Sequence, residues 1–201
     1  MEQPVTIVCA QLTLEGRLHR GSGKKAVVLS HPHPLYGGDM DNPVVGTAQA
    51  VFARHGRTTL RFNFRGTGAS QGRHDNGRGE TDDVRAALAH VQRPGVEEIE
   101  LAGYSFGAWV NAHAAPAVPM VMVSPPLAFM PFDGCGTISG LKLVIAGSND
   151  DFCPIGMLEK AIPLWNPLAR LVVIDGADHF FSGRAGPLAA ALELFAGQTA
   201  D

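Results

Sequence analysis

The chain has 201 residues, of which 45% are hydrophobic and 17% are charged, and its formal net charge at pH 7 is −3. These values predict one globular domain over residues 1–201 and exclude a disordered chain. The sequence has no run of Lys or Arg and no apolar run of the roughly 18–20 residues that cross a bilayer, so we expect neither a nucleic-acid nor a membrane partner. No signal peptide is visible, and Cys9, Cys135 and Cys153 show no paired spacing, which favours a cytoplasmic location.

Apolar segments of two kinds then alternate along the chain. Residues 5–20 predict one or two opening strands, and the continuous apolar run at 26–31 is typical of a strand buried on both faces. Further strands are predicted at 58–64, 98–103, 118–124, 141–147 and 169–175. Helices are predicted at 42–56, 80–92, 106–115, 154–163 and 187–197. The first helix carries an apolar face, formed by Val44, Val45, Ala48, Val51 and Phe52, and Pro163 is expected to end the fourth.

This alternation predicts an α/β fold, a mostly parallel twisted sheet with helices on both faces. Ligands bind such sheets at the carboxyl ends of the strands. Candidate functional residues are therefore sought directly after each predicted strand.

The segment "GYSFG" follows the predicted strand 98–103 and opens a predicted helix. G-x-S-x-G in this context is typical of a nucleophile, here Ser105, held on a sharp turn. Gly103 and Gly107 are expected to avoid collisions with the neighbouring strand and helix. The N–H of Phe106 then becomes one donor for an oxyanion. The alternative is an ordinary turn with a helix-capping serine.

A serine hydroxyl needs a base, and the base needs an orienting acid. Asp150 and Asp151 follow the strand 141–147, and His179 follows the strand 169–175. This gives the chain order Ser, Asp, His. We favour Asp150 because it lies closer to the end of its strand, while Asp151 remains an alternative that could instead cap the next helix.

Five segments together resemble one known family. They are "HPHPLYGGDMDNPVV", "LRFNFRGTGASQG", "GYSFGA", "AGSNDDFCP" and "GADHFF". In order and spacing they are similar to the α/β-hydrolase superfamily, and within it to small lidless bacterial serine esterases related to the dienelactone-hydrolase group. The resemblance implies a three-layer α/β-hydrolase fold without a lid domain, with Ser105 as nucleophile, Asp150 as acid and His179 as base. No cofactor is expected.

The stretch that begins at His31 is expected to supply the second oxyanion donor. Proline has no N–H, which excludes Pro32 and Pro34 and leaves three candidates, His33, Leu35 and Tyr36. The family parallel points to His33, or to Leu35 if the turn is wider.

A metal site is the alternative interpretation of this stretch. His31 and His33 form H-x-H, and Asp39 and Asp41 follow. A catalytic metal normally needs three or more converging ligands, and no second cluster stands apart from the serine residues. No metal is therefore expected.

Only residues 125–140 separate the strands 118–124 and 141–147, which is too short for a lid. We therefore expect a shallow, open cleft with apolar walls that include Tyr36, Phe129 and Met130. Such a cleft favours a small ester with a short acyl chain, cleaved by a carboxylesterase. A thioesterase, peptidase or lactonase using the same residues and a non-catalytic binding module remain alternatives, and the sequence does not decide between a monomer and a homodimer.

Overall fold

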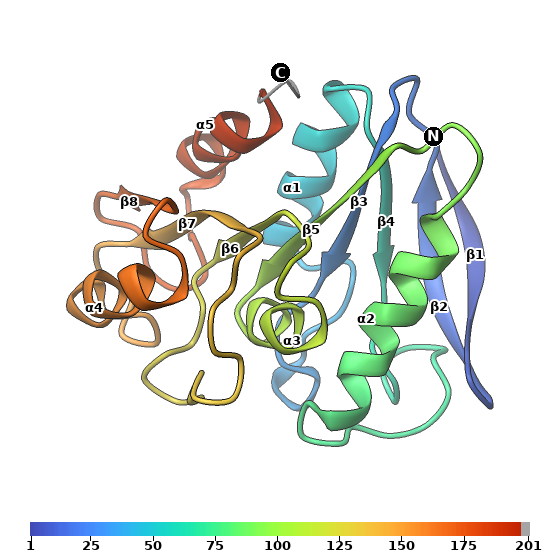
Figure 1. The fold of residues 1–201 in the computed structure, drawn as a ribbon, viewed down its shortest axis with the longest axis horizontal. Coiled ribbons are helices and arrows are strands. Elements are labelled where there is room, and N and C mark those ends of the chain that lie inside the picture. The colour runs from blue at the N-terminus through green and yellow to red at the C-terminus, as the bar shows by residue number, and fades with distance from the viewer. Residues whose placement is uncertain (198–201) are drawn as a thin grey trace.

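The computed structural model describes residues 1–197, which form one eight-stranded sheet covered by helices (Figure 1). The strands are β1 (Glu2–Cys9), β2 (Leu12–His19), β3 (Lys25–Ser30), β4 (Thr58–Phe62), β5 (Glu98–Tyr104), β6 (Met120–Val123), β7 (Leu141–Gly147) and β8 (Arg170–Ile174). They lie in the order β1-β2-β4-β3-β5-β6-β7-β8. β2 is antiparallel to both of its neighbours, and the pairs from β4–β3 to β7–β8 are parallel. The predicted mostly parallel sheet is confirmed.

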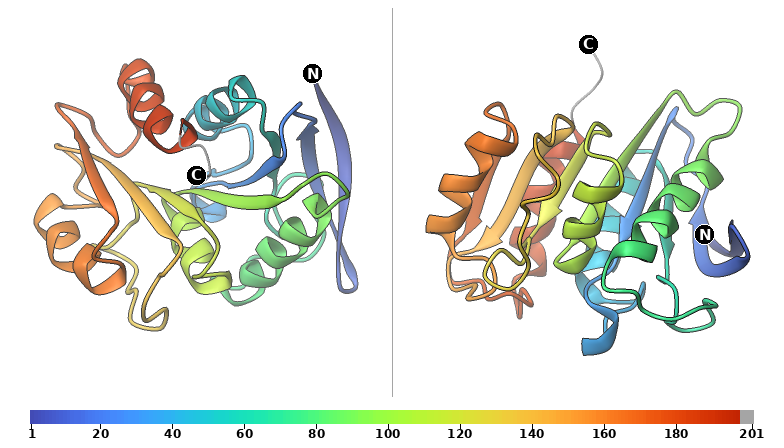
Figure 2. Two further views of the ribbon diagram at one scale, coloured as in Figure 1. Left: turned by 45° about the horizontal axis from the view of Figure 1, so that its top comes forward. Right: turned by 60° about the horizontal axis from the view of Figure 1, so that its bottom comes forward.

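Helices cover both faces of this sheet. They are α1 (Pro43–Arg54), α2 (Arg78–Val91), α3 (Phe106–Ala114), α4 (Ile155–Trp165) and α5 (Ala185–Ala196), and a short 3-10 helix, η1 (Pro34–Tyr36), follows β3. The left view of Figure 2 shows α1 and α5 on one face and α2, α3 and α4 on the other. Each face has its own apolar cluster. The three-layer arrangement is therefore confirmed.

The opening segment forms two strands joined by a tight turn at Ala10 and Gln11. β1 lies at the edge of the sheet, so only part of it is covered. Ile7 is fully buried, whereas Val8 on the opposite side is 71% exposed. The central strands β3 and β6 are instead buried almost throughout, as their continuous apolar sequences predict.

The predicted helix at 154–163 differs from the structure at its end. Pro163 lies inside α4, which continues to Trp165. A proline at this position removes the amide that would bond the carbonyl of Glu159. Because Glu159 is exposed, water can replace that partner, and Asn166 N–H still donates to Ile162 O at 2.9 Å.

Residues 124–140 connect β6 and β7 without a helix or strand, as expected of a fold without a lid. In the part of the chain that the structure describes, no helix combines the length and the apolar character needed to cross a membrane.

Candidate active site

Ser105 lies on the turn between the central strand β5 and helix α3, in a backbone conformation that side-chain-bearing residues rarely adopt. Its φ and ψ are 52° and −119°. Two glycines permit this turn. A Cβ at Gly103 would lie 2.6 Å from Ala108 Cα, and one at Gly107 would lie 2.3 Å from Ser30 O. The expected reason for both glycines is therefore confirmed, and α3 begins directly against the end of β3.

The structure brings Ser105, His179 and Asp150 together in one hydrogen-bonded series. Ser105 Oγ lies 3.0 Å from His179 Nε2. On the other side of the ring, His179 Nδ1 lies 2.9 Å from Asp150 Oδ1 and 3.0 Å from Oδ2. All three residues are at most 7% exposed. Nδ1 is therefore the ring nitrogen that holds the proton opposite the carboxylate, which leaves Nε2 free to accept from the serine hydroxyl.

Asp150 is held in place by the turn that follows it. Its Oδ1 accepts the backbone N–H groups of Phe152 and Cys153, each at 3.0 Å. Asp151 is exposed, and α4 begins at Ile155 with Pro154 as its N-cap residue, so Asp151 does not cap that helix. The structure thus places Asp150, and not its neighbour, against His179.

Sequence reasoning missed two aromatic residues that support the histidine. The Tyr104 hydroxyl donates to the backbone carbonyl of His179 at 2.9 Å. Burial, reinforced by the negative charge of Asp150, raises the pKa of Tyr104, so the phenol remains a donor. The ring of Phe152 stacks on the imidazole of His179, with centroids 4.5 Å apart. The position of Tyr104 directly before the serine is the one sequence signal that could have pointed to the first of these contacts.

His31 is fully buried, and both of its ring nitrogens have partners. Nε2 accepts the N–H of Phe64 at 3.0 Å, so Nδ1 carries the proton and donates to Pro32 O at 2.6 Å. Burial lowers the pKa of His31 to about 4. In residues 1–197 no group of three or more His, Cys, Asp or Glu side chains is arranged to hold a metal ion. His31 therefore fixes the loop that follows β3.

The three candidate N–H donors of this loop differ in their hydrogen bonds. Leu35 N–H donates to His33 Nδ1 at 3.2 Å, and Tyr36 N–H donates to His33 O at 3.1 Å. The predicted donor Leu35 thus has its amide paired with the side chain of His33 in this conformation. The N–H of His33 and that of Phe106 have no acceptor among the described residues.

The predicted apolar wall residues lie in different surroundings. Tyr36 is 88% exposed and packs on the ring of His33, with centroids 4.9 Å apart. Phe129 is 66% exposed, and its ring lies 4.8 Å from that of Phe152, which covers His179. Met130 instead packs against the apolar cluster below α2, α3 and α4. Phe129 and Phe152 thus form an aromatic shelf beside the histidine, whereas Met130 is partly buried against the apolar cluster.

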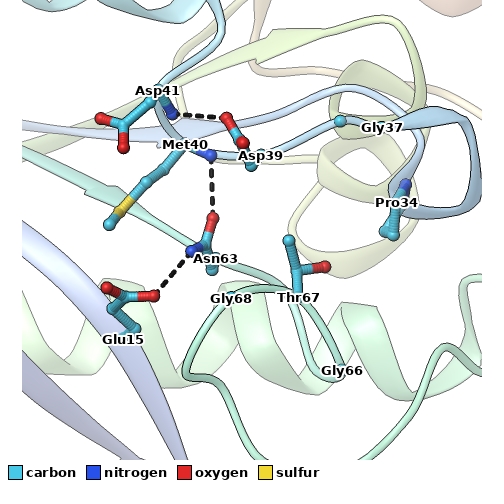
Figure 3. A pocket seen from close by; sticks show the side chains of 11 residues that line it. Glu15, Pro34, Gly37, Asp39, Met40, Asp41, Asn63, Gly66, Thr67 and Gly68 are labelled. Carbon is cyan, nitrogen blue, oxygen red and sulfur yellow. Dashed lines mark hydrogen bonds between the residues drawn. The ribbon is translucent and has the colours of Figure 1, made fainter.

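A separate polar hollow of about 480 Å³ shares the loop that carries His33 but includes none of the three hydrogen-bonded residues of the site (Figure 3). Several of its polar groups bond one another, whereas the buried Thr67 hydroxyl has no partner among the described residues. Asn63 donates to Glu15 Oε2 at 2.8 Å and accepts Met40 N–H at 2.8 Å, and Asp41 N–H donates to Asp39 Oδ1 at 2.9 Å.

The mostly parallel sheet, with a serine on the sharp turn after its central strand, defines an α/β-hydrolase fold. No family model matches the sequence. A curated relative, an uncharacterized protein of Rickettsia prowazekii, is 34% identical over 192 residues, which cover 84% of this chain and 77% of the relative.

Solved structures give the class of these relatives. An α-beta serine hydrolase homologue from Coxiella burnetii is 35% identical, with a TM-score of 0.87, over 94% of this chain and 95% of its own. A serine hydrolase without a lid from Xanthomonas campestris is 29% identical, with a TM-score of 0.85, over 96% and 92%. The chain belongs to the α/β serine hydrolase family, as its sequence motifs predict.

Proposed function

We propose that this chain is a carboxylesterase that cleaves small esters with short acyl chains through an acyl-enzyme on Ser105. The observation that carries the proposal is the hydrogen-bonded series Ser105–His179–Asp150. In this order the carboxylate orients the imidazole, and the imidazole can accept the serine proton. No metal or cofactor has a part in this reaction.

In the first half-reaction, Ser105 Oγ attacks the ester carbonyl while His179 Nε2 takes the hydroxyl proton. Asp150 keeps the proton of His179 on Nδ1 and stabilises the imidazolium that forms. His179 then gives its proton to the leaving alcohol. In the second half-reaction, water activated by His179 releases the acid and restores Ser105.

The negative charge on the carbonyl oxygen needs donors that are otherwise unpaired. We assign this role to the N–H groups of Phe106 and His33. The two residues are neighbours, because their rings lie 4.8 Å apart. Each such donor contributes on the order of 3 kcal/mol to transition-state stabilisation.

The preference for small, short-acyl esters rests on what surrounds the histidine. No lid is present between β6 and β7, and the Phe129–Phe152 shelf beside His179 is open to solvent. A long acyl chain would find little apolar surface to pack against in such an open site. A short acyl chain needs little apolar surface to bind.

Hydrolysis of p-nitrophenyl acetate, butyrate, octanoate and palmitate tests this proposal. We expect the acetate and butyrate to give the highest kcat/KM, and S105A to abolish turnover and labelling by a fluorophosphonate probe. D150N should lower kcat by about 10³- to 10⁴-fold because the imidazole loses its orienting carboxylate.

D151N is the matched control, since Asp151 is the exposed neighbour. Its kcat should equal that of the wild type. Turnover by S105A, or a loss in D151N as large as in D150N, would contradict the assignment.

A further inference from the structure

His74 lies in the loop between β4 and α2 and contacts both residues assigned to the oxyanion. Its side chain is only 9% exposed. The ring centroid of His74 lies 4.8 Å from that of His33 and 5.6 Å from that of Phe106. Together with the 4.8 Å contact between His33 and Phe106, the three rings form a closed triangle. A shift of His74 therefore reaches both donor segments at once.

Glu80, in the first turn of α2, bonds the loop that carries His74. The residue is completely buried. Its Oε1 accepts Asp75 N–H at 2.9 Å and its Oε2 accepts Gly77 N–H at 2.8 Å. His74 Nδ1 lies 2.8 Å from Oε1. One carboxylate thus fixes the backbone of the loop on both sides of the turn and also attracts the imidazole that the loop carries.

His74 Nδ1 lies close to the Glu80 carboxylate, but the two groups do not meet the geometry of a hydrogen bond. A close approach of this nitrogen to a carboxylate is attractive only when the nitrogen carries a proton, since two lone pairs would repel. Glu80 thus makes two hydrogen bonds to the loop backbone and one close contact with the His74 ring.

His33 differs from His74 although the two rings are in contact. Burial, reinforced by the neighbouring His74, lowers the pKa of His33. His33 also needs a lone pair on Nδ1 to accept Leu35 N–H. His33 is therefore neutral where it packs on the ring of His74. Because His33 carries no charge, the loop after β3 and the loop before α2 do not repel each other through these two residues.

The loop is seated on the helix that begins at Phe106. A Cβ at Gly77 would lie 2.2 Å from the Trp109 ring of α3, so only glycine permits this approach. The ring of Trp109 in turn stacks on that of Phe106, with centroids 6.2 Å apart. The loop between β4 and α2 thus contacts the start of α3 through its backbone at Gly77 as well as through the ring of His74.

We propose that His74 and Glu80 are positioning residues for the oxyanion hole, which fix the backbone N–H groups of His33 and Phe106. This inference rests on the proposed esterase function. Oxyanion donors act only when they point at the place where charge develops, and a misplacement on the order of 1 Å costs about 100-fold in rate. Neither His74 nor Glu80 exchanges a proton with substrate in this role.

The test compares H74A, H74F and E80Q with the wild type on p-nitrophenyl butyrate. We expect H74A and E80Q to lower kcat by about 10- to 100-fold with KM changed less than about twofold, because donor geometry matters most in the transition state. H74F keeps a ring against His33 and Phe106 but loses the contact with Glu80, so kcat should fall less in H74F than in H74A.

A trifluoromethyl ketone with a short alkyl chain separates positioning from general structural damage. It adds to Ser105 and forms a tetrahedral oxyanion, so its Ki should rise in each variant by the factor by which kcat/KM falls. D82N is the matched control, because Asp82 is an exposed carboxylate on the same helix. It should match the wild type in both measurements.

Each outcome of the experiment decides something. Unchanged kcat in folded H74A and E80Q, or a lower kcat with unchanged Ki, would overturn the positioning role while the esterase proposal stands. If H74A does not fold, H74F and E80Q carry the same comparison. A wild type that neither hydrolyses esters nor labels at Ser105 would overturn both proposals.

Discussion

His31 follows β3 with both ring nitrogens in hydrogen bonds, Nδ1 to Pro32 O and Nε2 from Phe64 N–H. A second proton would displace the Phe64 contact and place a charge in a site with no exposed surface. The low pKa of His31 is the consequence of that burial. The same residue that shapes the loop of the candidate oxyanion hole therefore makes folding depend on pH.

This dependence has a definite sign and window. The pKa of His31 is about 4 in the folded chain and near 6.5 in the unfolded chain. As the pH falls from about 6.5 to about 4, His31 binds a proton in the unfolded state but not in the folded state, so the free energy of unfolding falls. The loss amounts to about 3 kcal/mol and is complete below about pH 4.

H31Q isolates this contribution in urea unfolding at a series of pH values. The amide oxygen of glutamine can accept Phe64 N–H in place of Nε2 and does not titrate. We expect the stability of H31Q to change less than that of the wild type between pH 7 and pH 4. Other titrating groups, including His33, are common to both proteins and cancel in the difference. Parallel curves for the two proteins would contradict the assignment to His31.

The three hydrogen-bonded residues of the site could be placed from sequence because each lies in the segment that follows a parallel strand. The proposed choice of His33 over Leu35 could not, because it depends on which loop amides already have acceptors in the folded chain. His74 and Glu80 lie far beyond the end of β4, and only the folded chain brings His74 against His33 and Phe106 and Glu80 against His74. Their contacts join residues far apart in the sequence, which no local pattern records.

At the scale of the secondary-structure elements, two helical glycines lie in opposite surroundings. Gly107 begins α3, and a Cβ there would lie 2.3 Å from Ser30 O and 2.8 Å from His31 O. Gly46 lies in α1, and a Cβ there would meet no atom within 4 Å. The same substitution should therefore have opposite effects in the two helices.

We expect G46A to stabilise the chain by about 0.5–1 kcal/mol, because alanine restricts the unfolded state and favours the helix. G107A should destabilise it by about 1–3 kcal/mol or more, because backbone must move to admit the methyl group. Urea unfolding of both variants measures the two effects. Equal changes in stability would show that α3 does not pack against the end of β3 as described.

Helix α1 shows how far periodicity reaches. Its five predicted apolar residues are all buried, and Asn42 caps it by accepting Val44 N–H at 2.9 Å. The end of α4 was predicted wrongly, because tolerance of Pro163 depends on solvent at Glu159. The spacing of apolar residues along a helix can be found in the sequence itself. Whether the carbonyl that Pro163 leaves unbonded can reach water depends on the surface of the folded chain.

At the scale of the whole molecule, one buried ion pair connects the sheet to helices at both ends of the chain. Arg57, just before β4, bonds Glu100 on β5 through Nε at 2.5 Å and Nη2 at 3.2 Å. Its Nη1 donates to the carbonyl of Ala196 in α5, and its guanidinium lies 5.7 Å from the ring of Phe52 in α1. Arg57 and Glu100 are each at most 4% exposed.

Removing one partner of a buried pair leaves the other charge without compensation. R57M should therefore destabilise the chain by about 3–5 kcal/mol, since within residues 1–197 the remaining cation near Glu100 is Lys25, whose Nζ is 3.7 Å away. In the double variant R57M/E100M no charge is stranded, and its stability should exceed that of R57M although it carries one substitution more. A double-mutant cycle in urea measures the coupling.

The exposed pair of Asp82 and Arg85 serves as the control for this cycle. Both side chains reach solvent, so D82N should change stability by less than about 1 kcal/mol. Additive effects of R57M and E100M would mean that the two charges do not depend on each other. Strong coupling would show that the two charges stabilise the chain as a pair, at the point where Arg57 also bonds the last residue of α5.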